Sequence, residues 1–302
     1  MHVRTANAPV SYGIYSTDTA PLAPDELLAA FRTAGYAGTD SGPLGYLGEG
    51  QALARRLTAH GLRLAGGWAD LRYGGDRDDF AADLRALDRT LDTFASVPVD
   101  DAVFAPRPTL ACPAHPRRFA APGTPVDPAL GLTDAEWEPF AADVQTAADR
   151  CRARGLEPVF HPHLGTVVEA PDETRRLLSR TDVSLCLDTG HWWLAGGDPA
   201  EAVAEWGPRI RQVHLKDADR RALARVRRAG GDLWRVVAEG GFRALGEGEI
   251  DLAAVVAALR RAGYAGWLVV EQDTPPTGQN LDRIAAHQSA NRRLLQEEGL
   301  CS

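Results

Sequence analysis

The sequence predicts a (β/α)8 barrel, also called a TIM barrel, in which eight parallel strands close into a cylinder covered by helices. Short apolar segments alternate strictly with longer amphipathic ones along the 302 residues, and such alternation indicates a parallel sheet with covering helices. The length suits one barrel, since about 250 residues are typical. The first predicted turn, 11–15, has no glycine-rich phosphate loop, which a doubly wound open sheet would usually carry. We expect residues 1–302 to form a single barrel domain.

Eight apolar segments have the length and composition of strands buried on both faces. Between them lie segments with the apolar periodicity of helices that cover such a sheet. The predicted strands are 3–10, 37–41, 62–68, 101–105, 156–161, 183–187, 210–215 and 267–271. The predicted helices are 25–34, 51–60, 78–94, 134–154, 171–179, 199–206, 252–262 and 281–297.

Turn and capping residues support these boundaries. The sequence Ala-Gly-Tyr-Ala-Gly occurs at 34–38 and again at 262–266, each time between a predicted helix and a strand. Glycine at such a joint can adopt the left-handed conformation that ends a helix. Thr133 and Glu136 have the spacing of a capping box. Asp198 before Pro199 is typical of a helix start.

Two predicted connections are unusually long, 106–132 after the fourth strand and 217–249 after the seventh. Both leave carboxyl ends of strands, where barrel active sites lie. Loops of this length commonly act as lids or binding elements. The arginine-rich run 220–228 predicts a solvated basic helix, with an anion or partner site as the alternative.

Composition and charge argue against several classes of function. The formal net charge of -8 argues against a nucleic-acid partner, which normally meets a basic face. No apolar run approaches the roughly 20 residues that span a membrane, and the first residues lack the apolar core of a signal peptide. The four cysteines fit no zinc-ribbon spacing, and we expect a buried Cys186 and a reducing compartment, the cytoplasm. The sequence sets no oligomeric state and allows a homo-oligomer.

Polar residues follow the last four predicted strands, at ends that converge in a barrel. Imidazoles and carboxylates together are suitable ligands for a divalent cation such as Mn²⁺, Co²⁺, Zn²⁺ or Fe²⁺. Because side chains alternate along a strand, two histidines at the fifth strand end can share a face. The residues are His161, His163, Asp188, His191, His214, Lys216 and Glu271.

Each of these residues alone also has a structural explanation. His214 could anchor a loop by hydrogen bonds, Asp188 could cap the following helix, and Glu271 could pair with an arginine. Lys216 could contact substrate or form an ion pair with Asp217. Their joint occurrence on consecutive strand ends favours the metal site over the separate explanations. The tryptophans Trp68, Trp192 and Trp193 could line the pocket or pack in the core.

Six stretches resemble the xylose-isomerase-like sugar isomerase and epimerase superfamily, and within it the inosose dehydratase branch. Two of them, 188–191 (DTGH) and 213–217 (VHLKD), are shared across the superfamily, which also includes endonuclease IV. The stretches 42–47 (GPLGYL) and 161–169 (HPHLGTVVE) point to the dehydratase branch. The remaining two are 8–13 (APVSYG) and 246–251 (GEGEID).

The resemblance implies one divalent metal, Mn²⁺ or Co²⁺ first, with Zn²⁺, Fe²⁺ and Mg²⁺ as alternatives. Its ligands map onto Asp188, His214 and Glu271, with a fourth from the end of strand five. Many superfamily members have Glu where this chain has His161, so His161, His163 and Glu169 compete for that place. This departure weakens any epimerase mechanism that needs two glutamates.

Two further departures lie near the start of the chain. The dehydratase branch is expected to have Glu where this chain has Asp40, and Trp where it has Tyr12. The substrate-binding candidates are His191, which could instead be a metal ligand, together with Lys216, Trp68 and Asp40.

The expected function is dehydration of a keto-polyol such as 2-keto-myo-inositol through an enolate, which a bound metal would stabilise. The base that removes the α-proton is Glu271, His163 or Glu169, and the acid that assists loss of the hydroxyl group is His191 or Lys216.

Three alternatives remain. The first is an isomerase or epimerase on a keto-sugar, and the second is a DNA repair enzyme similar to endonuclease IV, which the net charge disfavours. The third is a non-catalytic barrel that serves as a partner subunit or ligand sensor, with 217–249 as its docking surface.

Overall fold

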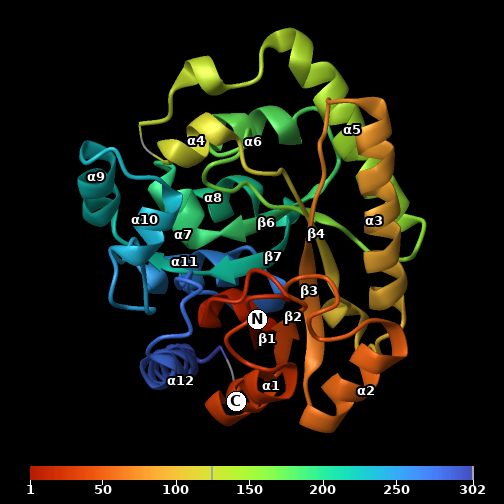
Figure 1. The fold of residues 1–302 in the computed structure, drawn as a ribbon, viewed down its shortest axis with the longest axis vertical. Helices are drawn as coiled ribbons and strands as arrows, with labels where there is room; N and C mark the ends of the chain where they lie inside the picture. The colour runs from red at the N-terminus through yellow and green to blue at the C-terminus, as the bar shows by residue number, and fades with distance from the viewer. Residues whose placement is uncertain (124, 301–302) are drawn as a thin grey trace.

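The computed structural model describes residues 1–123 and 125–300, and in it eight parallel strands close into a barrel (Figure 1). The strands follow one another around the barrel in the order β1-β10-β7-β6-β5-β4-β3-β2. This closure confirms the predicted fold class. The bounds are β1 His2–Asn7, β2 Gly38–Asp40, β3 Arg63–Asp70, β4 Arg107–Ala111, β5 Val159–Phe160, β6 Ser184–Asp188, β7 Ile210–Leu215 and β10 Ala265–Val270.

The first and last strands of the barrel close it along a continuous ladder. β1 pairs with β10 from His2 opposite Ala265 to Asn7 opposite Val270. On the other side of β10, Val269 lies opposite His214 of β7, and Asp188 of β6 lies opposite His214 in turn. The parallel register therefore brings the carboxyl ends of β6, β7 and β10 together at one end of the barrel.

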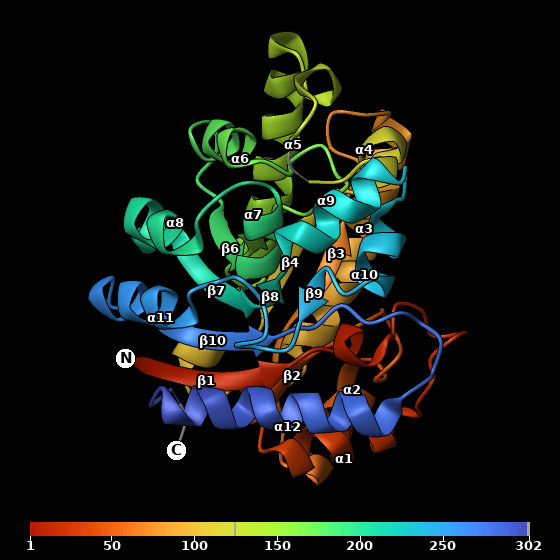
Figure 2. The same cartoon turned by 90° about the vertical axis from the view of Figure 1, so that its left-hand side faces the viewer.

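Helices cover the outside of the barrel, and α12 runs alongside β1 and α1 in Figure 2. Side chains cap several of them as predicted: Thr133 and Glu136 form the capping box of α5, and Asp198 accepts from the backbone N–H groups of the first turn of α8. The main covering helices are α1 Pro24–Ala34, α2 Gly50–His60, α3 Arg77–Ala95, α5 Asp134–Arg152, α6 Pro171–Leu178, α8 Pro199–Trp206, α11 Leu252–Arg261 and α12 Leu281–Glu297.

The position predicted for the fourth strand, 101–105, is wrong. Ala102–Phe104 forms a 3-10 helix, which Asp101 caps by accepting from the Val103 N–H at 2.9 Å. The strand is β4, Arg107–Ala111, and it lies inside the segment predicted as the loop 106–132. Pro108 interrupts the apolar pattern there, and proline ordinarily counts against a central strand. The connection after β4 is therefore 112–133, and it contains the short helix α4, Pro116–Ala120.

The long segment after β7 is not an open loop. It contains the antiparallel pair β8 Asp217–Ala218 and β9 Phe242–Arg243, with α9 Arg220–Arg228 and α10 Leu233–Ala238 between them. The arginine-rich run forms a helix as predicted, but it is amphipathic, with Leu223 and Val226 buried. Arg227 donates to the carbonyl oxygens of Pro122 (2.7 Å) and Gly123 (2.5 Å), which fixes α9 to the connection after β4.

The structure also bears on two further sequence expectations, one about the cysteines and one about membrane-spanning segments. Cys112, Cys151 and Cys186 are buried and free of disulfides, whereas Cys301 lies outside the described residues. Among the described helices, none combines the length and the apolar character that crossing a membrane requires.

Candidate metal centre and active site

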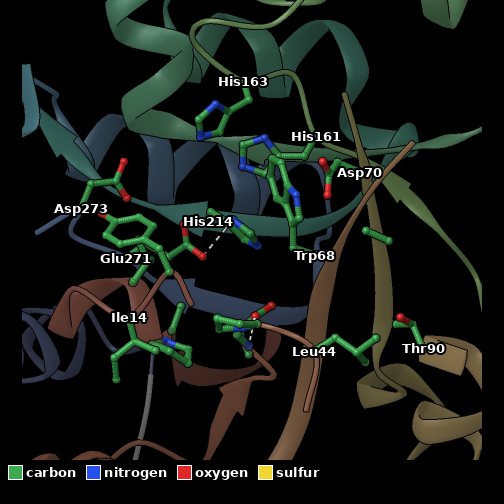
Figure 3. Close-up of a pocket in the computed structure, with 18 of the residues that line it drawn as sticks. Ile14, Leu44, Trp68, Asp70, Thr90, His161, His163, His214, Glu271 and Asp273 are labelled. Atoms are coloured by element: carbon green, nitrogen blue, oxygen red, sulfur yellow. Dashed lines mark hydrogen bonds and ion pairs between the residues drawn. The ribbon is translucent and has the colours of Figure 1, made fainter. Parts of the chain in front are cut away.

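A cavity of about 550 Å³ opens at the carboxyl ends of the barrel strands. Figure 3 shows His161, His163, His214, Glu271 and Asp273 pointing into it from β5, β7 and β10 or from the turns that follow them. These side chains form the polar floor of the cavity. The sequence-based expectation that polar strand ends converge is thus met in space, because the eight strands close into a barrel.

Three buried side chains place their ligand atoms within 4.8 Å of one another: His214 and Glu271, which line the cavity, and Asp188, which does not. The Nδ1 atom of His214 lies 3.3 Å from Oε1 of Glu271 and 3.9 Å from Oδ2 of Asp188. They come from the adjacent strands β6 and β7 and from the residue directly after β10, so the register of the sheet sets their spacing. The structure therefore brings together the three residues that the resemblance implied as ligands.

His161 completes this group from the end of β5. Its Nδ1 lies 2.9 Å from the carbonyl oxygen of Pro162, and because a carbonyl only accepts, the ring proton sits on Nδ1. Burial lowers the pKa of His161, so the ring is neutral and Nε2 carries a lone pair. Nε2 faces Oδ2 of Asp188 at 3.4 Å. Two electron-pair donors that face each other without a proton are the arrangement that a cation bridges.

Unsatisfied polar atoms support the same conclusion. Oδ2 of Asp188 and both ring nitrogens of His214 are buried and make no hydrogen bond, which is rare for buried polar groups. Asp188 and His214 have ion-pair contacts with Lys216 and Glu271, and a divalent ion would add the close bonding partner that these atoms lack, so the residues fit a metal site. The alternative trio of His161, Cys186 and His214 fits less well, because burial raises the pKa of the Cys186 thiol and a metal binds the thiolate.

Asp188 serves two purposes with its two oxygens. Oδ1 accepts from the backbone N–H of His191 at 2.9 Å and so caps α7, Thr189–Leu194. Oδ2 is the atom that faces His161 and the ammonium group of Lys216. The capping explanation and the ligand explanation therefore apply together, because the cap holds the second oxygen toward the site.

Lys216 is buried among carboxylates. Its Nζ lies 2.8 Å from Asp273, 3.0 Å from Glu271 and 3.4 Å from Asp188. Burial acts to lower the pKa of Lys216, but the three carboxylates outweigh it and hold the pKa well above its usual value. The side chain is therefore a permanent ammonium that orients Glu271 and Asp273. Asp217, the alternative partner, instead accepts from the backbone of Gly246 and Gly248 at 2.9 Å.

His163 faces the cavity, and His191 lies behind it. The two rings have centroids 3.8 Å apart, and Nε2 of His191 lies 3.0 Å from Nζ of Lys216. Nδ1 of His163 lies 2.8 Å from the carbonyl oxygen of Leu164, which places the ring proton on Nδ1. Burial, and then His191, lower the pKa of His163 well below its usual value. His163 is thus a neutral imidazole with a free lone pair on Nε2.

Glu169 is not among the residues that line the cavity. Its buried carboxylate accepts from the backbone N–H of Gly123 at 2.7 Å and of Gly165 at 2.5 Å. Burial raises the pKa of Glu169 to about 7. The position of this side chain indicates that it ties the connection after β4 to the turn after β5.

Of the remaining expected residues, Asp40 and Trp68 line the cavity. Oδ1 of Asp40 accepts from the Gly42 N–H at 2.8 Å, and burial followed by the charge of Glu271 raises the pKa of Asp40 to about 6. Trp68 meets both His161 and His163 edge to face. Trp192 instead packs in the core against Trp206. The guanidinium group of Arg220 stacks over the ring of Trp193.

The cavity residues that were not predicted from the sequence include Asp70, Asp273, Tyr15 and Trp234. Asp273 follows Glu271 by two residues, and the period of two along an extended chain could have indicated it. Asp70 ends β3 and could have been found by extending the search to every strand end. Trp234 carries no such signal, because it reaches the cavity from α10 in the segment after β7.

Comparison with known proteins agrees with this fold. Residues 28–294 match the family described as xylose isomerase-like TIM barrel, and the chain belongs to this family. It is 33% identical over 277 residues to the rhizopine catabolism protein MocC of Rhizobium meliloti, covering 87% of this chain and 82% of that protein. It is 32% identical over 261 residues to an inosose dehydratase of Geobacillus kaustophilus (strain HTA426), covering 83% and 80%. A crystal structure of IOLI protein with a binding zinc atom superposes with a TM-score of 0.68 at 14% identity, covering 97% of both chains.

Proposed function

We propose that this protein is a metal-dependent lyase that dehydrates a keto-polyol such as 2-keto-myo-inositol. The observation that carries the proposal is the close grouping of the buried ligand atoms of Asp188, His214 and Glu271, with His161 facing Asp188, beside the neutral imidazole of His163. Relatives named inosose dehydratase support this reaction, and solved epimerases of the same fold fit the alternative. The substrate would be a small polyhydroxylated carbonyl compound, since the floor of the cavity offers both donors and acceptors.

His161, Asp188, His214 and Glu271 would hold the ion, with His161 as the fourth ligand because its Nε2 faces Asp188. When bound, a divalent ion acts as a Lewis acid that polarises the substrate's ketone. Mn²⁺ or Co²⁺ is our first choice, because mixed nitrogen and oxygen ligands suit them. Lys216 keeps Glu271 oriented, and Asp40 and Trp68 border the space that the substrate would occupy.

His163 is the base that the geometry favours. Its Nε2 can accept the α-proton, and the imidazolium that forms can give this proton to the departing β-hydroxyl, which leaves as water. Lys216 is a poorer acid, because the surrounding carboxylates raise its pKa. An epimerase would need a second base on the opposite face of the substrate, and His161 stands where many superfamily members have Glu.

A turnover assay tests the proposal. Metal-stripped protein is incubated with 2-keto-myo-inositol, with and without added Mn²⁺ or Co²⁺, while the ultraviolet absorbance is followed. Dehydration creates a conjugated product, so we expect absorbance to grow only when metal is present. No growth with metal bound would exclude dehydration of this substrate, and exchange of the α-proton with deuterated water would then favour an epimerase.

Two substitutions separate the base from the residue that ties the loops. His163→Gln should lower kcat by about 10²–10⁴-fold, because a positioned general base contributes that much, and the variant should keep its metal.

Glu169→Ala should lower the free energy of unfolding by about 1–3 kcal/mol, because two buried N–H groups lose their acceptor, while turnover is largely kept. A loss of kcat in Glu169→Ala at unchanged stability would instead identify Glu169 as the base.

A further inference from the structure

The mouth of the cavity is apolar and aromatic. The large hydrophobic side chains that the described chain leaves most exposed are Met1, Tyr15, Leu44, Trp68, Val99 and Trp234. Four of these six, Tyr15, Leu44, Trp68 and Trp234, line the active-site cavity. Exposed hydrophobic residues scattered singly need no explanation, but their concentration at one cavity marks a binding surface.

One side of this mouth is built from three aromatic rings that come from distant parts of the chain. Tyr15 follows β1, Phe119 belongs to α4 and Trp234 belongs to α10. The rings of Tyr15 and Trp234 meet at 90° with centroids 4.9 Å apart, and those of Phe119 and Trp234 at 67° and 6.3 Å. We call these three residues the aromatic rim. The hydrogen bonds of Arg227 join the segments after β4 and β7 that carry two of them.

The polar side chains of the cavity lie on its floor and on the side toward α3, where Asp70, Asp83 and Thr90 line it. Below the aromatic rim, Leu233 and Val237 continue the apolar wall, and Leu44, Leu71 and Leu87 line the side toward α3. A six-carbon polyol carries hydroxyl groups around its whole edge, and each buried hydroxyl needs a hydrogen-bond partner. The aromatic rim supplies few such partners, since Tyr15 and Trp234 carry one polar group each and Phe119 carries none. The 550 Å³ of the cavity also falls in the range of about 300–1,000 Å³ that accommodates drug-sized ligands.

We propose that the substrate of this site is a cyclic keto-polyol that carries an aromatic substituent. The keto-polyol ring occupies the floor beside His163 and His214, and the aromatic group lies against the aromatic rim. This inference rests on the proposed function for the ring that reacts. It adds the substituent, which the reaction itself does not require.

The test measures binding, so it does not depend on turnover. Phenyl β-glucoside and methyl β-glucoside serve as non-reacting probes, and their Kd values for the metal-loaded protein are measured by calorimetry. We expect the phenyl compound to bind about tenfold more tightly, because edge-to-face and stacked aromatic contacts add to the buried area. Trp234→Ala should remove most of this preference. Val99→Ala, a change to an exposed hydrophobic side chain outside the cavity, is the matched control and should preserve it.

Equal Kd values for the two glucosides would overturn the proposal, as would a Trp234→Ala variant that weakens both equally. Tyr15→Ala provides a second test of the aromatic rim and should also reduce the phenyl preference. The outcome is separate from that of the turnover assay. A phenyl preference without dehydration of 2-keto-myo-inositol would contradict only the proposed reaction, and dehydration without a phenyl preference would contradict only the substituent.

Discussion

His214→Ala should lose the divalent ion and the catalytic activity together. His214 lies between Asp188 and Glu271, and Nδ1 is the atom that approaches both carboxylates. Alanine leaves these two carboxylates facing each other without the imidazole. Because removal even of the partners that orient metal ligands typically costs 10–100-fold in affinity or activity, we expect loss of a ligand itself to cost at least about 100-fold in both.

Metal content after dialysis and kcat/KM with excess metal measure the two losses separately. His60→Ala is the matched control, since His60 ends α2 and pairs with the exposed Asp25, far from the cavity lining. This control should keep both metal and activity. A His214→Ala variant with full activity would exclude the proposed metal centre, and one that keeps its metal but loses activity would make His214 a substrate contact.

Most of the fold could be predicted because its signals are local. Helix α12 was expected at 281–297 and has those bounds, and α8 matches 199–206 in the same way. Apolar periodicity, capping side chains and terminal glycines act within a few residues of one another, so these signals are visible in the local sequence. The fourth strand was misplaced because Pro108 lies within β4, and what overrides this local signal is the pairing of β4 with β3 and β5.

The site residues likewise divide into those that the local sequence predicts and those that depend on how distant loops pack. Asp188, His214 and Glu271 could be predicted because each ends a recognisable strand, and the closure of the barrel then brings the strand ends together. Glu169 illustrates the limit: its position six residues after His163 is compatible with the cavity, but the chain turns and its carboxylate meets the N–H groups of Gly123 and Gly165. Contacts of that kind depend on how two loops pack, and no local pattern encodes them.

Lys216→Met should strongly destabilise the metal-free protein. Methionine nearly preserves the length and apolar stem of the side chain but removes the ammonium group that contacts Asp188, Glu271 and Asp273. Three buried carboxylates would then lie close together without a compensating charge. Removing one partner of a buried ion pair costs about 3–5 kcal/mol, because the remaining charge stays buried, and we expect a loss of that size in the free energy of unfolding.

Denaturant unfolding of the metal-free and the Mn²⁺-loaded protein tests this explanation, because the ion would supply positive charge to the same carboxylates. The loss caused by Lys216→Met should therefore be smaller with Mn²⁺ than without it. Arg235→Met is the matched control: Arg235 pairs with Glu239 on the exposed face of α10, and an exposed pair contributes about 0–1 kcal/mol. If Lys216→Met cost no more than Arg235→Met, the ammonium group would not be what holds these carboxylates together, and Lys216 would be better explained as a substrate contact.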